Sequence, residues 1–372
     1  MSRPRRRRTE ESLKVAVRVR PFNFREIERN AKLVIQMQGN TTTIQDPSKP
    51  NSEPRRFTFD HSYWSHDQFK TAEDGYLRDD GSGKYADQKQ VFDDLGRGVL
   101  SNAWDGYNCS LFAYGQTGSG KSYSVVGYDA NKGIIPQFCD TLFQEIKEKE
   151  DSESYKKEED DFAVQLSMIE IYNEQVKDLL NLKSYKKGGL RVRQSKDMGF
   201  QVENLRIQDV NSYGEIEALI AEGTKARTIA ATNMNKTSSR AHTVVTIYFK
   251  QKTSVTGKSM TKTAQVALVD LAGSERASST GASGDRLKEG AAINLSLTCL
   301  GKCISALADQ SMGKQTRVPY RDSKLTMLLK NALGGNSKTM MVAALSPADI
   351  NYTAYKFKIS SFFEIILKMF KN

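Results

Sequence analysis

The chain has 372 residues, 38% of them hydrophobic and 27% charged, which is enough apolar material for one large α/β core beneath a solvated surface. Lys and Arg number 55 against 44 Asp and Glu, and the net charge of +11 favours a polyanionic partner: nucleic acid, an anionic membrane or an acidic protein surface. No apolar run is long enough to span a bilayer, and no apolar segment follows the Arg-rich start, so we expect neither a transmembrane helix nor a signal peptide. We therefore expect a soluble intracellular protein, with Cys299 and Cys303 as packed thiols.

The first elements follow from simple patterns. Residues 1–12 form a basic arm that we predict to be disordered. Residues 13–20 alternate apolar and basic side chains, which predicts a half-buried strand that Pro21 ends. At its end, Arg18-Val19-Arg20-Pro21 places guanidinium groups and a rigid ring where a flat base could stack. Next come a predicted strand at 57–60, a surface loop at 65–88 and a helix at 91–103.

The sequence Gly115-Gln116-Thr117-Gly118-Ser119-Gly120-Lys121-Ser122 has the pattern G-x-x-x-x-G-K-[ST] of a P-loop. Glycines let the backbone N–H groups curl around phosphate oxygens, Lys121 adds a cation and the Ser122 hydroxyl is suited to bind Mg²⁺. Residues 109–114 before it predict a buried strand, and the residues from Tyr123 on predict a helix whose N-terminus faces the phosphates. This context predicts a nucleoside triphosphate site.

Strands and helices alternate in the rest of the chain. Such alternation predicts a layered α/β domain. The predicted elements are a helix at 134–146, a charged loop at 147–161, a strand at 162–172, a basic hairpin surface at 185–195, a helix at 212–228, and strands at 243–250 and 263–271 joined by a turn near 256–258.

Two further motifs complete a phosphate site. Asp270-Leu271-Ala272-Gly273 ends an apolar strand, where the Asp270 carboxylate can lie near Mg²⁺ and the Gly273 N–H can reach the γ-phosphate. The segment Asn235 to His242 contains Ser238-Ser239-Arg240, and Arg240 could pair with Glu275 when both loops close on the nucleotide.

These motifs, in this order, resemble those of the kinesin motor domain, from residue 13 to about residue 352. Arg18 to Pro21 resembles the adenine-side motif of that family, Asn235 to His242 its switch I, Asp270 to Arg276 its switch II, and Val318 to Thr326 its microtubule-facing segment. Details such as Tyr63-Trp64-Ser65-His66 resemble the third kinesin family, the vesicle and organelle transporters. The resemblance implies a P-loop NTPase fold, with a central mixed β-sheet flanked by helices on both faces.

The resemblance also implies roles for individual residues. ATP would contact Arg18, Arg20, Pro21 and the loop from Gly115 to Tyr123; Ser122, Ser239 and Asp270 would hold Mg²⁺. Ser238, Ser239, Arg240, Gly273 and Glu275 would form the catalytic group, with Glu275 in the proton relay. The acidic microtubule would be the polyanionic partner, bound by Lys288, Lys314, Arg317, Arg321 and Lys324.

The implied activity is a microtubule-stimulated ATPase that drives plus-end-directed movement of cargo along the cytoplasmic cytoskeleton. Cargo would bind through regions absent from this chain. We expect the motor domain as given to be monomeric. The alternatives are an ATP-regulated microtubule-binding protein that does not move and a nucleic-acid-dependent P-loop ATPase. We expect no specific nucleic-acid binding, because no aromatic and basic strand face is evident.

The sequence departs from the family at two places. The loop 309–316 carries one lysine, Lys314, where third-family motors carry a lysine run. Residues 353–372 replace the expected last helix and neck linker with an amphipathic segment that has Phe362, Phe363 and Ile366 on its apolar face. This segment could pack as the usual last helix does, lie on a membrane surface, or derive from an altered reading frame, so the sequence does not support directional stepping.

Overall fold

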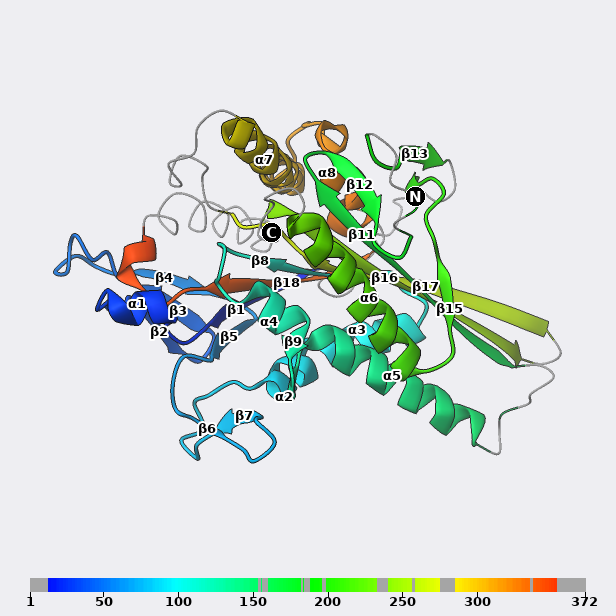
Figure 1. The fold of residues 1–372 in the computed structure, drawn as a ribbon, viewed down its shortest axis with the longest axis horizontal. Helices are drawn as coiled ribbons and strands as arrows, with labels where there is room; N and C mark the ends of the chain where they lie inside the picture. The colour runs from blue at the N-terminus through cyan, green and yellow to red at the C-terminus, as the bar shows by residue number, and fades with distance from the viewer. Residues whose placement is uncertain are drawn as a thin grey trace, which may run out of the picture.

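A computed structural model describes residues 13–152, 155, 160–181, 183, 188–195, 199–232, 240–255, 258–274, 285–334 and 337–352. Within these residues the centre of the protein is a nine-stranded mixed β-sheet (Figure 1). Its strands are β1 (Leu13–Val19), β5 (His61–Trp64), β8 (Cys109–Tyr114), β11 (Asp161–Tyr172), β12 (Gln175–Asp178), β15 (Gln208–Val210), β16 (His242–Val255), β17 (Lys258–Asp270) and β18 (Lys338–Leu345).

The sheet has a parallel and an antiparallel half. The strand order is β12-β11-β16-β17-β8-β18-β1-β5, with β15 also paired to β11. From β17 to β5 neighbouring strands run parallel, and from β12 to β17 they run antiparallel. Parallel strands are usually covered on both faces, and every residue of β8 is buried. The predicted mixed sheet is confirmed.

Helices cover both faces of the sheet, and a separate hydrophobic core lies between the sheet and the helices on each face. Figure 1 shows α7 and α8 on one side of the sheet and α3 and α5 on the other. Successive side chains of a strand point to opposite faces, so Leu111 of β8 packs in the core under α3, α5 and α6, while Phe112 packs in the core under α7 and α8. The helices are α3 (Arg97–Trp104), α5 (Ile134–Glu150) and α6 (Tyr213–Thr232), and α7 (Asp285–Ser311), α8 (Lys324–Leu328) and α9 (Lys330–Gly334).

The remaining elements are short. Three of them, β2, β3 and β4, form a small antiparallel sheet, and β6–β7, β9–β10 and β13–β14 are two-stranded. They are α1 (Phe24–Glu28), β2 (Ile35–Gln38), β3 (Thr41–Ile44), β4 (Arg55–Thr58), β6 (Phe69–Thr71), β7 (Leu77–Asp79), α2 (Gln88–Val91), the π-helical turn η1 (Phe92–Gly96), α4 (Lys121–Val125), β9 (Gly127–Tyr128), β10 (Asn131–Lys132), β13 (Val192–Ser195), β14 (Gly199–Val202), and the 3₁₀ turns η5 (Tyr320–Asp322) and η6 (Asp349–Asn351).

Several predictions about the first hundred residues were wrong in part. β1 lies between β18 and β5, so its second half is fully buried rather than half-buried. The strand predicted at 57–60 corresponds to β4, whereas the strand that joins the main sheet is β5. The loop predicted at 65–88 contains the β6–β7 hairpin, which is fixed because Asn131 accepts a hydrogen bond from Leu77 N (2.9 Å) and donates one to Gly75 O (3.0 Å).

Further along the chain the predicted elements are found with longer bounds. The helix predicted at 91–103 begins at Gln88, because the Asp87 side chain caps it by accepting from Gln90 N at 2.8 Å. The helix predicted at 134–146 continues to Glu150, with Lys147 and Lys149 in its last turn, where cations favour a helix C-terminus. The two strands of the β16–β17 hairpin extend beyond their predicted ends, to Val255 and from Lys258.

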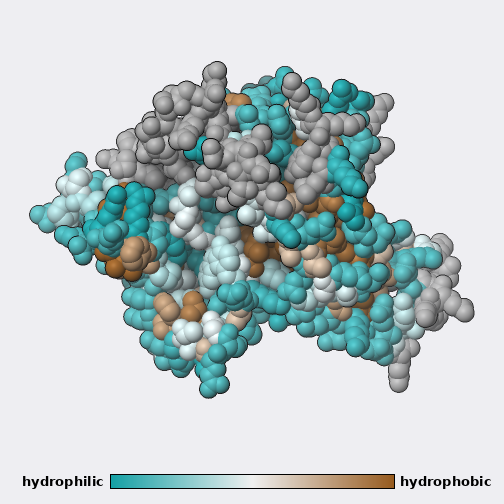
Figure 2. All heavy atoms as spheres, viewed as in Figure 1, coloured by the Kyte–Doolittle hydropathy of each residue, from teal (hydrophilic) through white to brown (hydrophobic). Residues whose placement is uncertain are grey.

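The surface is mostly polar on the face shown in Figure 2. An apolar patch lies over α1, in which Phe24 and Ile27 are 82% and 63% exposed. All four cysteines are free and buried, which confirms that Cys299 and Cys303 are packed thiols. Among the described residues, no helix combines the length and apolarity that crossing a membrane requires.

Candidate functional site

The P-loop connects the carboxyl end of β8 to α4, as the sequence predicts. Its glycines adopt backbone angles that other residues rarely take, with φ of +152° at Gly115, +69° at Gly118 and +100° at Gly120. At Gly115 a Cβ atom would lie 2.4 Å from the Ala344 carbonyl oxygen on β18. The loop therefore depends on glycine both for its curvature and for its close approach to the neighbouring strand.

Buried polar groups converge inside the loop. Lys121 is 8% exposed, and its Nζ donates to the carbonyl oxygens of Gly115 (3.1 Å) and Gln116 (2.8 Å). Gln116 Oε1, Ser119 Oγ and Asp270 Oδ1 are buried and have no hydrogen-bond partner among the residues that the structure describes. Because buried polar atoms are normally paired, this arrangement fits a polar ligand that would complete the pairing.

The second phosphate motif lies directly against the P-loop. β17 and β8 are parallel neighbours, with Asp270 opposite Ala113, so their carboxyl ends meet at one edge of the sheet. Ser122 Oγ donates to Asp270 Oδ2 at 2.6 Å, and Ser274 N donates to Gly115 O at 3.1 Å. Mg²⁺ prefers oxygen ligands, and this site offers a hydroxyl and a carboxylate whose second oxygen has no partner within the described part of the chain. These residues therefore fit a magnesium site.

His242 ties three segments together at this edge, and the sequence analysis missed its role. It begins β16, and its Nδ1 accepts from Ala272 N at 2.9 Å, between Asp270 and Gly273. Nδ1 is thus the acceptor, so Nε2 carries the proton and donates to Ser296 Oγ on α7 at 2.8 Å. Burial, helped by the nearby Lys121 charge, lowers the pKa of His242 to about 3. The ring is neutral and joins β16, the Asp270 motif and α7.

The lowered pKa of His242 predicts that the folded protein loses stability as the pH falls. Between pH 6.5 and about 3 the unfolded chain binds a proton at His242 that the folded protein does not bind. The free energy of unfolding therefore rises with pH in this window, and the term from His242 amounts to about 1.4 kcal/mol per pH unit. At pH 5 the folded state should have lost about 2 kcal/mol relative to pH 7 through this residue alone.

Denaturant unfolding of the protein and of His242→Gln at pH 7, 6 and 5 checks this expectation. His242→Gln should be less stable at pH 7, because its amide cannot reproduce both ring contacts, and should lose less stability on acidification. An equal loss in both proteins would contradict the assignment.

Arg18 lies inside the protein rather than at an open base-binding surface. It is 3% exposed, its Nε donates to Ser65 Oγ (2.9 Å), and its Nη1 donates to Gln88 Oε1 (2.6 Å). Its guanidinium carbon lies 5.1 Å from the centre of the Tyr123 ring. Burial lowers the pKa of Arg18, although nearby tyrosines oppose the shift. The geometry indicates that Arg18 supports the Tyr123 ring. The predicted contact of Arg18 with a nucleotide stays a prediction.

Arg20 and Pro21 lie beside the tip of the P-loop. Arg20 Nε donates to Gly118 O at 2.5 Å, and its Nη1 donates to Pro21 O at 2.6 Å. The structure thus brings Arg20, Pro21, the P-loop and Asp270 to one region. Ser238, Ser239 and Glu275 lie outside the described residues, and Arg240 is the first described residue after position 239.

Four of the five predicted basic contacts lie beyond α7 and around α8. Arg317 and Arg321 line one groove of about 520 Å³ together with Lys330, and Arg321 Nη2 donates to Gln194 Oε1 of β13 at 2.8 Å. Lys314 Nζ pairs with Asp309 Oδ1 at 2.7 Å just after α7, and Lys324 begins α8. Lys288 lies on α7, with its side chain outside the description. The structure brings Arg317 and Arg321 together on an exposed basic surface.

A mixed sheet with a P-loop at the carboxyl end of a buried strand, and an Asp bound to the P-loop serine, defines a P-loop NTPase. The sequence profile of the kinesin motor domain matches residues 18–357. The chain belongs to the kinesin motor-domain family.

Relatives and solved structures agree with this assignment. The chain is 52% identical to Kinesin-related protein 1 of Dictyostelium discoideum over 353 residues, and 52% identical to KIF1A of Rattus norvegicus over 354 residues; each match covers 92% of the chain. It spans only 15% and 20% of the lengths of these relatives. The relation to KIF1A confirms the predicted resemblance to the third kinesin family.

The fold matches a KIF14 dimer solved with AMP-PNP in complex with a microtubule, with a TM-score of 0.82 and 41% identity over 95% of this chain and 93% of that chain. A second KIF14 structure, with ADP and a microtubule, matches with a TM-score of 0.77 and 41% identity over 96% of this chain and 93% of that chain. The predicted kinesin motor fold is confirmed.

Proposed function

We propose that this chain is the motor domain of a microtubule-stimulated ATPase, which couples ATP hydrolysis to binding of microtubules in the cytoskeleton. The observation that carries the proposal is the contact between Ser122 and Asp270 beneath the glycine cradle of the P-loop. KIF14, which shares the fold, was solved with nucleotide and a microtubule.

The residues at the sheet edge have separate tasks in this proposal. The P-loop glycines and Lys121 bind the phosphates, and Ser122 and Asp270 hold Mg²⁺. Mg²⁺ supplies neutralisation of the charge on the phosphate oxygens. The Gly273 N–H faces the γ-phosphate, while Ser238, Ser239, Arg240 and Glu275 orient the attacking water, with Glu275 in the proton relay. Phosphoryl transfer depends on such positioning and charge stabilisation more than on a strong base.

α7 connects the nucleotide side to the basic surface. His242 binds Ser296 on α7, and the helix ends at Ser311, just before Lys314. At 1.5 Å per residue the distance along the helix from Ser296 to its end is about 22 Å. A shift of the Asp270 motif that displaces His242 therefore moves a rigid helix. Its end at Ser311 leads to four of the proposed microtubule contacts, Lys314, Arg317, Arg321 and Lys324, and the fifth, Lys288, lies on the same helix before Ser296.

Steady-state ATP hydrolysis with and without microtubules tests the proposal. Microtubules should raise turnover at least ~10-fold at about 0.02 M salt, and the stimulation should weaken at about 0.2 M salt because exposed charges are screened. Arg321→Ala should require more microtubules for half-stimulation, whereas Arg97→Ala, which alters a cation paired with Asp93, should not. Hydrolysis without stimulation would contradict the microtubule part, and absence of nucleotide binding would contradict the whole proposal.

A further inference from the structure

Glu26 has a deeply buried carboxylate near the P-loop and belongs to no motif of the nucleotide site. It lies on α1, where Asn23 and Glu26 cap each other: Asn23 Oδ1 accepts from Glu26 N and Glu26 Oε2 accepts from Asn23 N, both at 2.9 Å. Glu26 is 2% exposed. A buried carboxylate is stable only when charged or polar partners surround it.

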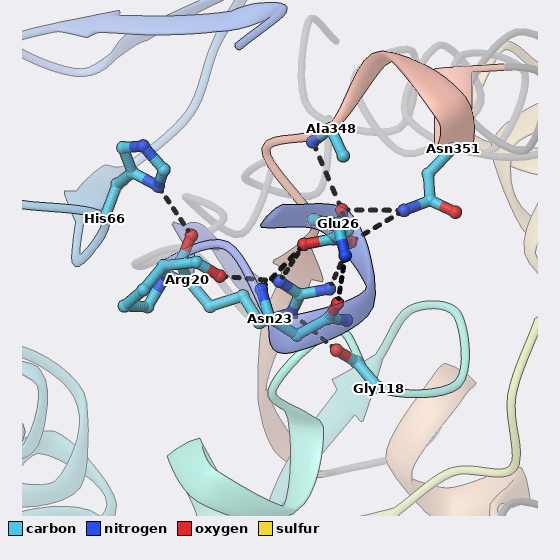
Figure 3. A network of polar contacts seen from close by, with 9 residues as sticks. Arg20, Asn23, Glu26, His66, Gly118, Ala348 and Asn351 are labelled. Atoms are coloured by element: carbon cyan, nitrogen blue, oxygen red, sulfur yellow. Dashed lines mark hydrogen bonds and ion pairs between the residues drawn. The ribbon is translucent and has the colours of Figure 1, made fainter. Parts of the chain in front are cut away.

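One partner of Glu26 leads to the P-loop. Arg20 binds it through two parallel contacts of 2.7 Å, from Nη1 to Oε2 and from Nη2 to Oε1. The Nε of the same guanidinium donates to Gly118 O at the tip of the P-loop. Figure 3 shows the guanidinium between the two. Because the guanidinium is planar and rigid, its position on Glu26 fixes where Gly118 can lie.

The other partners of Glu26 lie at the opposite end of the sequence. Ser346 Oγ, just after β18, donates to Glu26 Oε1 at 2.7 Å. Asn351 Nδ2 donates to the same oxygen at 2.8 Å and to Ser346 Oγ at 2.9 Å, while Ala348 N donates to Ser346 Oγ at 3.2 Å. Figure 3 shows Ala348 and Asn351 on the side of Glu26 away from Gly118. These residues form the turn 346–351, which carries the chain away from the sheet.

The charged state of Glu26 fits these contacts. Burial alone would raise its pKa, but the hydrogen bonds from Arg20, Asn23 and Ser346 outweigh burial and hold the pKa below its ordinary value. The carboxylate is therefore ionised at neutral pH, and any movement that removes one partner leaves a buried charge poorly compensated.

We propose that Glu26 is a positioning residue that couples the P-loop to the turn 346–351. A change at Gly118 acts through Arg20 on the carboxylate and thereby on Ser346 and Asn351. Coupling between two sites is reciprocal, so the conformation of the turn in turn alters the affinity of the P-loop for nucleotide. The inference rests on the proposed function, which assigns nucleotide binding to the P-loop. It adds a route from the P-loop to the end of the sheet that does not pass through α7.

Hydrogen exchange and ADP affinity, both measured on the full chain, test the coupling. In the unaltered protein ADP should slow exchange in residues 346–352. Glu26→Gln keeps the shape but removes the charge, so ADP affinity should fall about 10-fold and exchange in 346–352 should no longer respond to ADP. The matched control is Asp93→Asn, a carboxylate that pairs with Lys89 and Arg97 away from the P-loop; it should leave both readouts unchanged.

A second variant keeps the test decisive if Glu26→Gln does not fold. Asn351→Ala leaves Arg20, Glu26 and the P-loop intact, so weaker ADP binding in it supports the coupling. Its effect should also be smaller when Arg20→Lys is already present, because the two act through one carboxylate. Normal ADP affinity in Asn351→Ala, or exchange in 346–352 that ignores ADP in the unaltered protein, would overturn the inference. Failure of the unaltered protein to bind ADP would instead contradict the proposed function.

Discussion

Asp270→Asn should abolish the magnesium dependence of nucleotide binding and reduce ATP turnover about 100-fold or more. Asp270 accepts a hydrogen bond from the Ser122 hydroxyl with one oxygen, and the other oxygen is buried with no partner among the described residues. An amide keeps the size of the side chain but removes the charge that attracts a divalent cation. Metal stabilisation of the transferring phosphoryl group is worth several kcal/mol, and about 3 kcal/mol corresponds to about 100-fold in rate.

The measurement is ADP affinity with Mg²⁺ and with excess chelator, followed by steady-state turnover. Chelation should weaken binding to the unaltered protein and have little effect on Asp270→Asn. Asp209→Asn is a suitable control. Asp209 is also a strand residue whose carboxylate accepts one side-chain hydrogen bond, from Gln165 Nε2, but it lies on β15. If chelation weakened ADP binding equally in Asp270→Asn and the unaltered protein, Asp270 would not hold the metal.

The parts of this site that could be predicted from the sequence are those in which a local pattern determines the geometry. The apolar run of β8, the glycines after it and Lys121 are contiguous, so strand, loop and helix could be placed by pattern alone. Asp270 could be placed beside them because it ends a second buried strand, and parallel strands end at the same edge. Each step needs only one element and its immediate neighbours.

What could not be predicted depends on contacts between distant residues. Glu26 meets Ser346 and Asn351 across 320 and 325 positions of the chain. The Asn23 and Glu26 pair does carry a capping-box signal, but that signal predicts only a helix start. His242 ends a recognisable motif, yet nothing local indicates that its ring binds Ala272 and Ser296. The burial of Arg18 could not be predicted either, because its guanidinium binds Ser65 and Gln88, which lie 47 and 70 positions away in the chain.

Gly115→Ala should impair the P-loop more than any other single methyl addition in the loop. Its Cβ would lie 2.4 Å from Ala344 O and 2.6 Å from Ser119 Oγ. The first obstacle is the backbone of β18, which pairs with β8 and cannot rotate away. A φ of +152° adds strain for a residue with a side chain. Overpacking contributes about 1–3 kcal/mol and the sparsely populated backbone conformation about 1–3 kcal/mol, so ADP affinity should fall at least ~10-fold and the melting temperature should fall as well.

Two further alanine variants separate the causes of that effect. Gly118→Ala meets no atom of the described residues within 4 Å but has a φ of +69°, so it reports backbone strain without a close contact and should weaken ADP binding less than Gly115→Ala does. Gly301→Ala on α7 has no positive φ and, within the described part of the chain, no neighbour within 4 Å, so it should raise stability by about 0.5–1 kcal/mol without altering ADP affinity. Equal losses in Gly115→Ala and Gly118→Ala would show that loop strain, and not the contact with β18, requires glycine at position 115. A larger loss in Gly115→Ala would show that β18 shapes the phosphate cradle as directly as the P-loop itself.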